Sequence, residues 1–375
     1  MDLAQRLKSA RVSVNLTIEA VSKATRIGKS SVSEFENGRR EPSVSQLARL
    51  AEIYRRSMSF FFNDDDLAVG EQAVLWRLRP DNEAPMLERQ FLKLCEQYRL
   101  LEEWTNSVID QRLPSVEKGR HALTYGDVTD LAGRVGNELN LGDRPARVLL
   151  QVLEEDCGIK IFHRDFEPTG TAACVKSPSI GWAILLNSRN SVCRRNYDLA
   201  HELFHLLTWD LYRTSESGSN EEMPVDEEKL ANAFASALLL PAAALTRAVD
   251  RKRDEAGKIA VADFVEIARQ FGVSFEALVW RIHYVYNFGA ARQEQTRLLV
   301  EKVKNSQSAR RGEDDSGVTP PTLPDRYRML ARQALTNGEV SLSRFADFME
   351  ISRREALSYV ETEEAPLGEV QLTPA

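Results

Sequence analysis

Residues 201–205 read His-Glu-Leu-Phe-His, and two of the chain's five histidines lie in this short segment. The surrounding stretch, CRRNYDLAHELFHLL, has apolar residues at helical spacing and predicts a helix. Side chains four residues apart project from the same face of a helix, so the imidazoles of His201 and His205 can bind one ion. Glu202 then lies beside the ion, where its carboxylate can take a proton from water and pass it to a leaving amine. This division of roles is the chemistry of peptide-bond hydrolysis.

A two-histidine site needs a third protein ligand, and the next predicted helix begins with acidic residues. This helix, DEEKLANAFASALLLP, covers residues 226–241 and offers Asp226, Glu227 and Glu228. Periodicity favours Glu228 weakly, because it shares a helical face with small residues that let the two helices approach closely. Two imidazoles and one carboxylate suit Zn²⁺, which keeps a fourth position open in catalytic sites and lowers the pKa of bound water to about 7.

The flanking sequence predicts the elements that position these helices. Helical stretches near 126–141 and 145–157 precede short β-rich runs at 159–162, 171–175 and 182–187, and helices dominate again afterwards. This order fits an α+β domain better than a doubly wound one. We therefore expect a mainly α chain with a small β-sheet.

The first 62 residues form a basic module in an acidic chain. They hold eleven lysines and arginines against six acidic residues, a net charge of +5, while the whole chain carries −7. Four short helices are predicted, and Thr17 is the expected N-cap of the second. The link 25–28 between the second and third helices has the length of a helix-turn-helix elbow. A basic helical module in an acidic protein favours contact with nucleic acid.

The segments RLKSAR, LTIEAVSKAT, SSVSEFENGRREPS and LARLAEIY occur in an order and spacing that resembles the Xre/Cro-like phage repressor DNA-binding domains. The resemblance implies that the third helix enters the major groove of double-stranded operator DNA, with outward residues at base edges and two arginines near phosphates. The residues so implied are Lys29, Ser30, Ser33 and Glu34 for the bases, and Arg39 and Arg40 for the phosphates. A module used only for dimerisation or partner docking is the alternative.

The run AILLNSRNSVCRRNYDLAHELFHLL, followed by EKLANAFASALLLP, resembles the ImmA/IrrE family of zinc metallopeptidases over roughly residues 120–290. The resemblance implies a protein substrate, a transcriptional repressor, in phage, mobile-element or stress regulation. Phe204 stands where this family usually has glycine. The site so implied is one Zn²⁺ held by His201, His205 and Glu228, with Glu202 as the catalytic residue.

These patterns divide the chain into five predicted segments. A helix-turn-helix domain over 1–62 is followed by a helical connector over 63–119 and the metallopeptidase domain over 120–290. A helix and a flexible linker over 291–324 lead to a small helical unit over 325–375. We interpret this last unit as a docking or dimerisation module, with a second helix-turn-helix as the alternative. The amphipathic connector is expected to pack the two modules together or to form a homodimer interface.

Composition excludes several classes of protein. The hydrophobic fraction of 43% and charged fraction of 28% are ordinary for a soluble globular chain. The four cysteines include no CxxC pair, so neither a cysteine-rich zinc site nor a disulfide framework is predicted. The first residues lack the apolar core of a signal peptide, and the longest apolar stretch, 235–245, is too short to span a bilayer. We expect a cytoplasmic protein with no membrane partner.

The sequence leaves three functions open. The first is a DNA-associated zinc metallopeptidase that cleaves a protein partner. The second is a DNA-binding regulator or antitoxin whose metal domain is a sensor without peptidase turnover. The third is an interaction scaffold. Glu202 separates the first from the second, because a site that only binds metal does not need this carboxylate.

Overall fold

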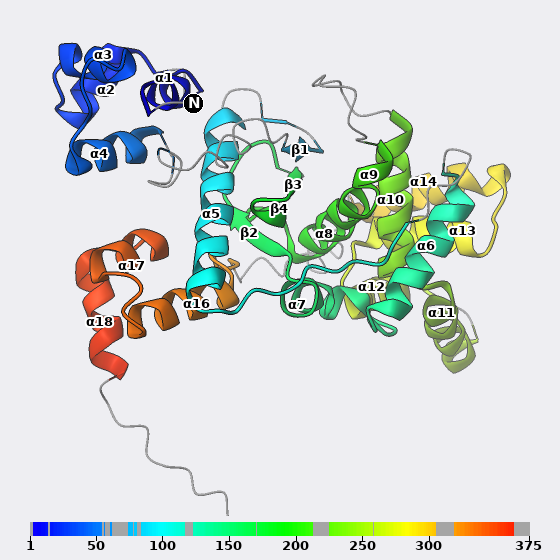
Figure 1. Cartoon of the computed structure of the whole chain (residues 1–375). Coiled ribbons are helices and arrows are strands. Elements are labelled where there is room, and N and C mark those ends of the chain that lie inside the picture. The colour runs from blue at the N-terminus through cyan, green and yellow to red at the C-terminus, as the bar shows by residue number, and fades with distance from the viewer. Residues whose placement is uncertain are drawn as a thin grey trace, which may run out of the picture.

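The chain folds into helices around one small sheet, which confirms the predicted α+β class (Figure 1). The computed structural model describes residues 3–13, 16–54, 56, 61, 74–77, 79–80, 84–116, 123–169, 171–212, 225–257, 259–304 and 319–363. Most of the predicted linker and the chain end after residue 363 lie outside the described residues, as do residues 213–224 between the two helices of the HExxH site.

The N-terminal module consists of four short helices around an apolar core. The Thr17 hydroxyl caps the second helix by accepting a hydrogen bond from the backbone N–H of Ala20. The turn that follows passes through Arg26 at φ 58° and places Ile27 in the core. Gly38, at φ 68°, follows the third helix in the left-handed conformation that glycine adopts without strain. The helices are α1 (Leu3–Ser13), α2 (Ile18–Thr25), α3 (Lys29–Glu36) and α4 (Val44–Tyr54).

The sheet has four strands in the order β1-β3-β4-β2 among the described residues. β3 pairs antiparallel with both β4 and β1, whereas β2 pairs parallel with β4. The three predicted β-rich runs are confirmed, and a two-residue strand from the connector adds an edge that the sequence did not reveal. The strands are β1 (Leu75–Trp76), β2 (Lys160–Arg164), β3 (Ala172–Ser177) and β4 (Gly181–Asn187).

One face of the sheet carries the helices of the HExxH site. Alternate strand residues such as Cys174, Ile184 and Leu186 face this side and join a core with Leu199 and Leu203. The helices on this side and beyond it are α6 (Tyr125–Glu138), α7 (Leu149–Glu155), α8 (Val192–Leu207), α9 (Trp209–Tyr212), α10 (Val225–Leu239), α11 (Ala242–Ala256), α12 (Val261–Phe271), α13 (Phe275–Val285) and α14 (Ala290–Lys304). The predicted helix at 145–157 begins as a 3₁₀ turn, Pro145–Arg147, before α7.

The opposite face of the sheet is covered by helices that precede and follow residues 120–290 in the sequence. Phe162 lies in one core with Phe91 and Tyr98 of the connector helix and with Tyr327 near the C-terminus. Segments far apart in sequence are thus joined through the sheet. On this side α5 (Ala84–Trp104) lies against the strands, and beyond it come α16 (Asp325–Thr336), α17 (Leu342–Met349) and α18 (Arg353–Glu363).

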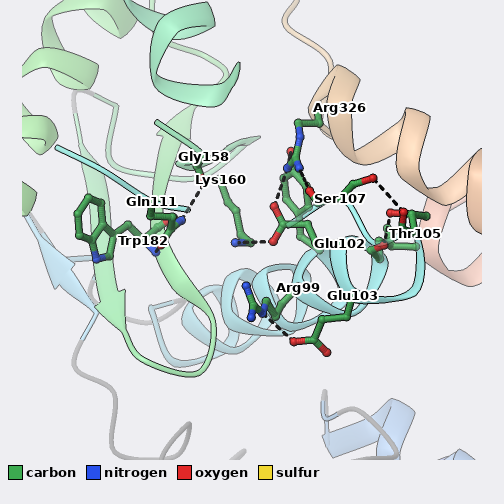
Figure 2. A network of polar contacts seen from close by, with 12 residues as sticks. Arg99, Glu102, Glu103, Thr105, Ser107, Gln111, Gly158, Lys160, Trp182 and Arg326 are labelled. Atoms are coloured by element: carbon green, nitrogen blue, oxygen red, sulfur yellow. Dashed lines mark hydrogen bonds and ion pairs between the residues drawn. The ribbon is translucent and has the colours of Figure 1, made fainter. Parts of the chain in front are cut away.

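A buried ion-pair network fastens α5, β2 and α16 together (Figure 2). Glu102 contacts Lys160 Nζ at 3.2 Å and Arg326 Nη1 at 2.6 Å, and the carboxylate and the ammonium are each only 2% exposed. Close by, the Gln111 amide donates to the Gly158 carbonyl at 2.7 Å and accepts from the Trp182 N–H at 2.8 Å. These contacts pin the segment after α5 to the starts of β2 and β4.

Within the described residues, no single helix is long and apolar enough to cross a membrane. One bent pair, Glu227–Leu239 with Ala242–Asp254, passes that test by combined length and composition.

Candidate metal centre

Helix α8 delivers the HExxH residues to the interior of the protein. Ser191 starts the helix, since its hydroxyl accepts a hydrogen bond from the Arg194 N–H. The helix lies across β3 and β4, and its apolar side joins the core beneath it. His201 and Glu202 are 0% exposed and His205 is 1% exposed. Charged and polar groups this deeply buried need partners, so their surroundings decide what they can bind.

Helix α10 brings Glu228 to the two imidazoles. Its Oε2 lies 3.3 Å from His201 Nε2, and its Oε1 lies 3.3 Å from His205 Nε2. The two Nε2 atoms are 3.1 Å apart. One potential ligand atom from each of the three residues therefore falls within 4.8 Å of the others. This is the carboxylate that the sequence favoured among three neighbours.

Glu227, one of the two competing candidates, has a different place. Its Oε1 lies 2.9 Å from His205 Nδ1, the ring nitrogen on the far side from Glu228, and Glu227 is 1% exposed. A carboxylate on the second nitrogen of a ligating histidine fixes the tautomer and orientation of the ring. The side chain of Asp226, the other competitor, lies outside the described residues.

The donor set fits a zinc ion. Two imidazoles and one carboxylate on two adjacent helices are a typical three-residue set for catalytic zinc. Neither Glu202 oxygen has an oxygen or nitrogen hydrogen-bond donor among the described residues, although both are buried. The Cys174 thiol of β3 is its neighbour. This carboxylate is buried next to three side chains that could bind a metal ion. It is therefore placed to contact a water molecule or a substrate that enters the site.

Burial and the neighbouring charges lower the pKa values of His201 and Glu228 and raise those of Glu202 and His205. Burial lowers the pKa of His201 to about 4, against the opposing contact with Glu228. Burial raises the pKa of Glu202 to about 7, opposed by the charge of His205 and the Cys174 thiol. Burial also disfavours the charged form of His205, but Glu227 and Glu228 outweigh it and raise its pKa to about 9. The imidazoles hold the pKa of Glu228 far below its usual range despite partial burial.

Arg77, which follows strand β1, joins the two ligand helices. Its Nη1 donates to Asp198 Oδ1 at 2.8 Å and its Nη2 to Asn232 Oδ1 at 3.2 Å. Asp198 lies one turn before Glu202 on α8, and Asn232 lies one turn after Glu228 on α10. The guanidinium thus spans both helices next to the residues that converge on the site.

Sequence reasoning missed Arg77, Asp198 and Asn232 as parts of this site. Arg77 sits in the connector, 121 and 155 residues from its two partners, so no local spacing relates them. The sequence pattern could have identified Asp198, because it lies three residues before His201 on the same face of a predicted helix. The Asn190 amide and the Arg194 guanidinium also contact this fully buried carboxylate.

Two other histidines lie apart from this cluster. His283 contacts the hydroxyl of Thr296 at 3.1 Å. His163 is buried in β2, and burial together with the charge of Arg195 lowers its pKa to about 4. Neither belongs to a group of potential metal ligands in the described part of the chain.

The residues expected to contact DNA line the start and end of α3. Lys29 begins the helix and forms an exposed ion pair with Glu19 at 2.5 Å, while Ser30 is exposed and Ser33 half-buried. Glu34 is half-buried, and both arginines after the helix are exposed, with Arg40 5.9 Å from the Phe35 ring centre. The six predicted residues, Lys29, Ser30, Ser33, Glu34, Arg39 and Arg40, therefore belong to one helix and its following turn.

Comparison with known proteins matches both parts of the chain. Residues 154–283 match the IrrE N-terminal-like domain family (Peptidase_M78), and residues 7–61 match the helix-turn-helix family. No curated protein matches the chain. A solved structure, a Mycobacterium tuberculosis transcriptional regulator, is similar at 22% identity and a TM-score of 0.32 over 51% of each chain, so this chain spans about half of that protein. The two family matches give the chain a helix-turn-helix segment over residues 7–61 and an IrrE N-terminal-like segment over residues 154–283.

Proposed function

We propose that this protein is a cytoplasmic, DNA-associated zinc metallopeptidase that hydrolyses a peptide bond in a protein partner, with a transcriptional repressor as the substrate. The carrying observation is the convergence of His201, His205 and Glu228 within 4.8 Å, with Glu202 buried next to them. The match to the Peptidase_M78 family supports the same reading. The helix-turn-helix domain would bring the enzyme to operator DNA, through Lys29 and the other residues of α3.

Each residue of the site has a defined task in this proposal. His201, His205 and Glu228 would hold one Zn²⁺, which when bound supplies a Lewis acid and an activated water. Glu202 accepts the proton of the attacking water and returns it to the leaving amine. Glu227 holds the His205 ring through Nδ1, so that Nε2 keeps facing Glu228.

A regulator that senses metal without hydrolysis is the second candidate. The near-complete burial of His201, Glu202 and His205 favours it, because a sensor needs no path for a polypeptide substrate. The two candidates make opposite predictions for the substitution Glu202→Gln. Loss of the carboxylate stops proton transfer in a peptidase, whereas a sensor keeps its metal and its regulation.

The first test measures metal content by mass spectrometry on the purified full chain and on His201→Ala, Glu228→Ala and Glu202→Gln. We expect about one zinc per chain, lost from the two ligand variants and kept by Glu202→Gln. The second test incubates the zinc-loaded protein with a mixture of oligopeptides and maps new termini by mass spectrometry. We expect cleavage by the native chain and a loss of roughly 10²–10⁴-fold in Glu202→Gln. Equal cleavage by both proteins would contradict the peptidase, and zinc retention without any cleavage would favour the sensor.

A further inference from the structure

Helices α16, α17 and α18 repeat helices α1, α2 and α3 in the same register. Helices α17 and α18 begin at Leu342 and Arg353, each 324 residues after Ile18 and Lys29, where α2 and α3 begin. Both α2 and α17 contain eight residues. The preceding helices, α1 and α16, overlap under the same offset. The first three helices of the helix-turn-helix domain and the C-terminal unit therefore align without an insertion or deletion.

The turns of the two units have the same backbone conformation. Arg26 follows α2 at φ 58° and ψ 27°, and Glu350 follows α17 at φ 55° and ψ 35°. Non-glycine residues rarely adopt this left-handed conformation. In both units an isoleucine comes next, Ile27 or Ile351, and the following helix, α3 or α18, begins two residues after it. A turn of this length and conformation joins the two helices of a helix-turn-helix motif in α2 and α3, and the same turn joins α17 and α18.

Capping is shared as well. Ser341 precedes α17, and its hydroxyl accepts a hydrogen bond from the Arg344 N–H at 3.3 Å. The Thr17 hydroxyl makes the equivalent bond to the Ala20 N–H at 3.1 Å. Equivalent positions are also buried or largely buried in both units, which requires the same inward faces. These pairs are Ala10 with Ala334, Val21 with Phe345, Val32 with Ala356, and Phe35 with Tyr359.

The connector helix α5 holds the C-terminal unit in place. Tyr98 contacts Tyr327 with ring centres 5.3 Å apart, and Trp104 stacks on Phe348 at 6.0 Å. These contacts involve α16 and α17. The outward face of α18 stays exposed, and Figure 1 shows α18 at the edge of the molecule, away from the sheet.

The exposed face of α18 carries side chains that suit a DNA major groove. Arg353 and Arg354 are exposed at its start. Leu357, one turn later, is 46% exposed. Arginine binds guanine O6 and N7 through two hydrogen bonds, and an apolar side chain contacts the thymine methyl group. The Glu355 carboxylate caps the helix by accepting from the Ser352 N–H and hydroxyl at 2.8 and 2.7 Å.

We propose that the C-terminal unit, residues 325–363, is a second helix-turn-helix and that α18 binds double-stranded DNA through Arg353, Arg354 and Leu357. In the register of the repeat these residues correspond to Lys29, Ser30 and Ser33 of α3. The chain then has two DNA-contacting helices. This inference goes beyond the proposed function, which requires only α3.

The test uses the full chain and a duplex of about 40 base pairs that this chain itself enriches from a random pool. Affinity is measured by fluorescence anisotropy, and contacts are mapped by hydroxyl-radical footprinting. We expect two protected segments with the native chain. Arg353→Ala/Arg354→Ala removes one segment and weakens binding at least about tenfold, since the contacts of both arginines with the bases are lost. Arg354→Lys keeps the charge but loses the bidentate contact, and is expected to fall between them.

Two control variants identify the cause of any change. Arg247→Ala/Arg297→Ala removes the same charge from exposed positions on α11 and α14 and should leave affinity within about twofold. Lys29→Ala/Arg40→Ala should remove the other protected segment, which tests α3 and the proposed function separately. Native affinity and footprint in Arg353→Ala/Arg354→Ala, with a native melting curve, would overturn the proposal and leave this face to a protein partner. An equal loss in the α11/α14 variant would overturn it too.

Discussion

At the residue scale, the His205 ring has a carboxylate at each of its two nitrogens. Glu228 faces its Nε2 at 3.3 Å, and Glu227 contacts its Nδ1 at 2.9 Å. The two neighbouring acidic residues therefore act on opposite sides of one ring. Only one of them is placed to bind the same ion as His201.

Removing Glu227 should therefore weaken zinc binding without removing a ligand. We expect Glu227→Ala to lower zinc affinity roughly 10–100-fold, because the ring loses the partner that fixes its tautomer. Competition with a chromophoric chelator measures this. Lys229→Ala, at an exposed position on the same helix, is the control and should bind zinc like the native chain. Native affinity in Glu227→Ala would show that the ring needs no such support.

Glu154 of α7 offers a prediction about pH. Burial raises the pKa of this carboxyl to about 8, with further increases from Asp325 and Glu155. A raised folded-state pKa favours the protonated side chain, so its contribution to stability is complete below about pH 4.5 and is lost as pH rises through about 8.

Glu154→Gln should thus flatten the pH dependence of unfolding. Between pH 5 and pH 9 we expect the Tm of the native chain to fall more than that of the variant by at least about 2 °C, as roughly 1 kcal/mol moves Tm by about 2–4 °C. Calorimetry at both values checks this. Glu138→Gln, an exposed change at the end of α6, should follow the native curve. A parallel fall in Glu154→Gln would mean that another group controls this range.

At the element scale, the site depends on the distance between α8 and α10. Arg77 spans both helices through Asp198 and Asn232, at 2.8 and 3.2 Å. Because Asp198 is fully buried, the guanidinium also balances a charge that would otherwise be costly there. The connector thereby takes part in building the candidate metal centre.

We expect Arg77→Ala to lower zinc affinity at least about tenfold and to change the visible spectrum of the Co²⁺-substituted protein, since the ligand helices lose their link. Arg79→Ala is the matched control, because Arg79 pairs with Glu88 in a surface contact two residues further along the same segment. An unchanged spectrum and affinity in Arg77→Ala would contradict this role.

The contrast between Glu228 and Arg77 defines how far sequence reasoning reaches. Both helices and the HExxH face follow from spacings within one helix. Periodicity favoured Glu228 only weakly, and the resemblance to the ImmA/IrrE family implied it as the third ligand. Strand β1 was missed because two residues carry no periodicity, and Arg77 was missed because its partners lie over a hundred positions away. Glu227 contacts Nδ1 of His205 because of the way α8 and α10 pack against each other, and no local sequence pattern encodes this packing.

At the scale of the whole molecule, the Glu102 network joins the sheet to the C-terminal helices. Glu102 is the shared acidic partner of Lys160 and Arg326 in a buried setting. Its neighbour Glu103 pairs with Arg99 on the surface of the same helix, at 2.8 Å (Figure 2). Two adjacent carboxylates thus have very different surroundings.

These surroundings predict different costs of neutralisation. Glu102→Gln leaves the buried Lys160 and the partly buried Arg326 without this counter-charge and should destabilise the protein by about 3–5 kcal/mol. Glu103→Gln removes only a surface pair and should cost about 0.3–0.5 kcal/mol. Urea titration of both variants measures the difference. Similar midpoints for the two would mean that water or relaxation compensates the buried site.

The participation of β1 and α5 has a consequence for how such a protein can evolve. The part of the chain that matches the IrrE-like family starts at residue 154, yet an edge strand, a helix over one sheet face and the Arg77 link all come from residues before 105. A gene rearrangement that moved only the matched segment would leave the edge of β3 unpaired and Phe162 uncovered, both of which promote aggregation. The unit that can be transferred with its fold intact is therefore longer than the segment that matches the family. Recombination that preserves the fold must carry the connector with it.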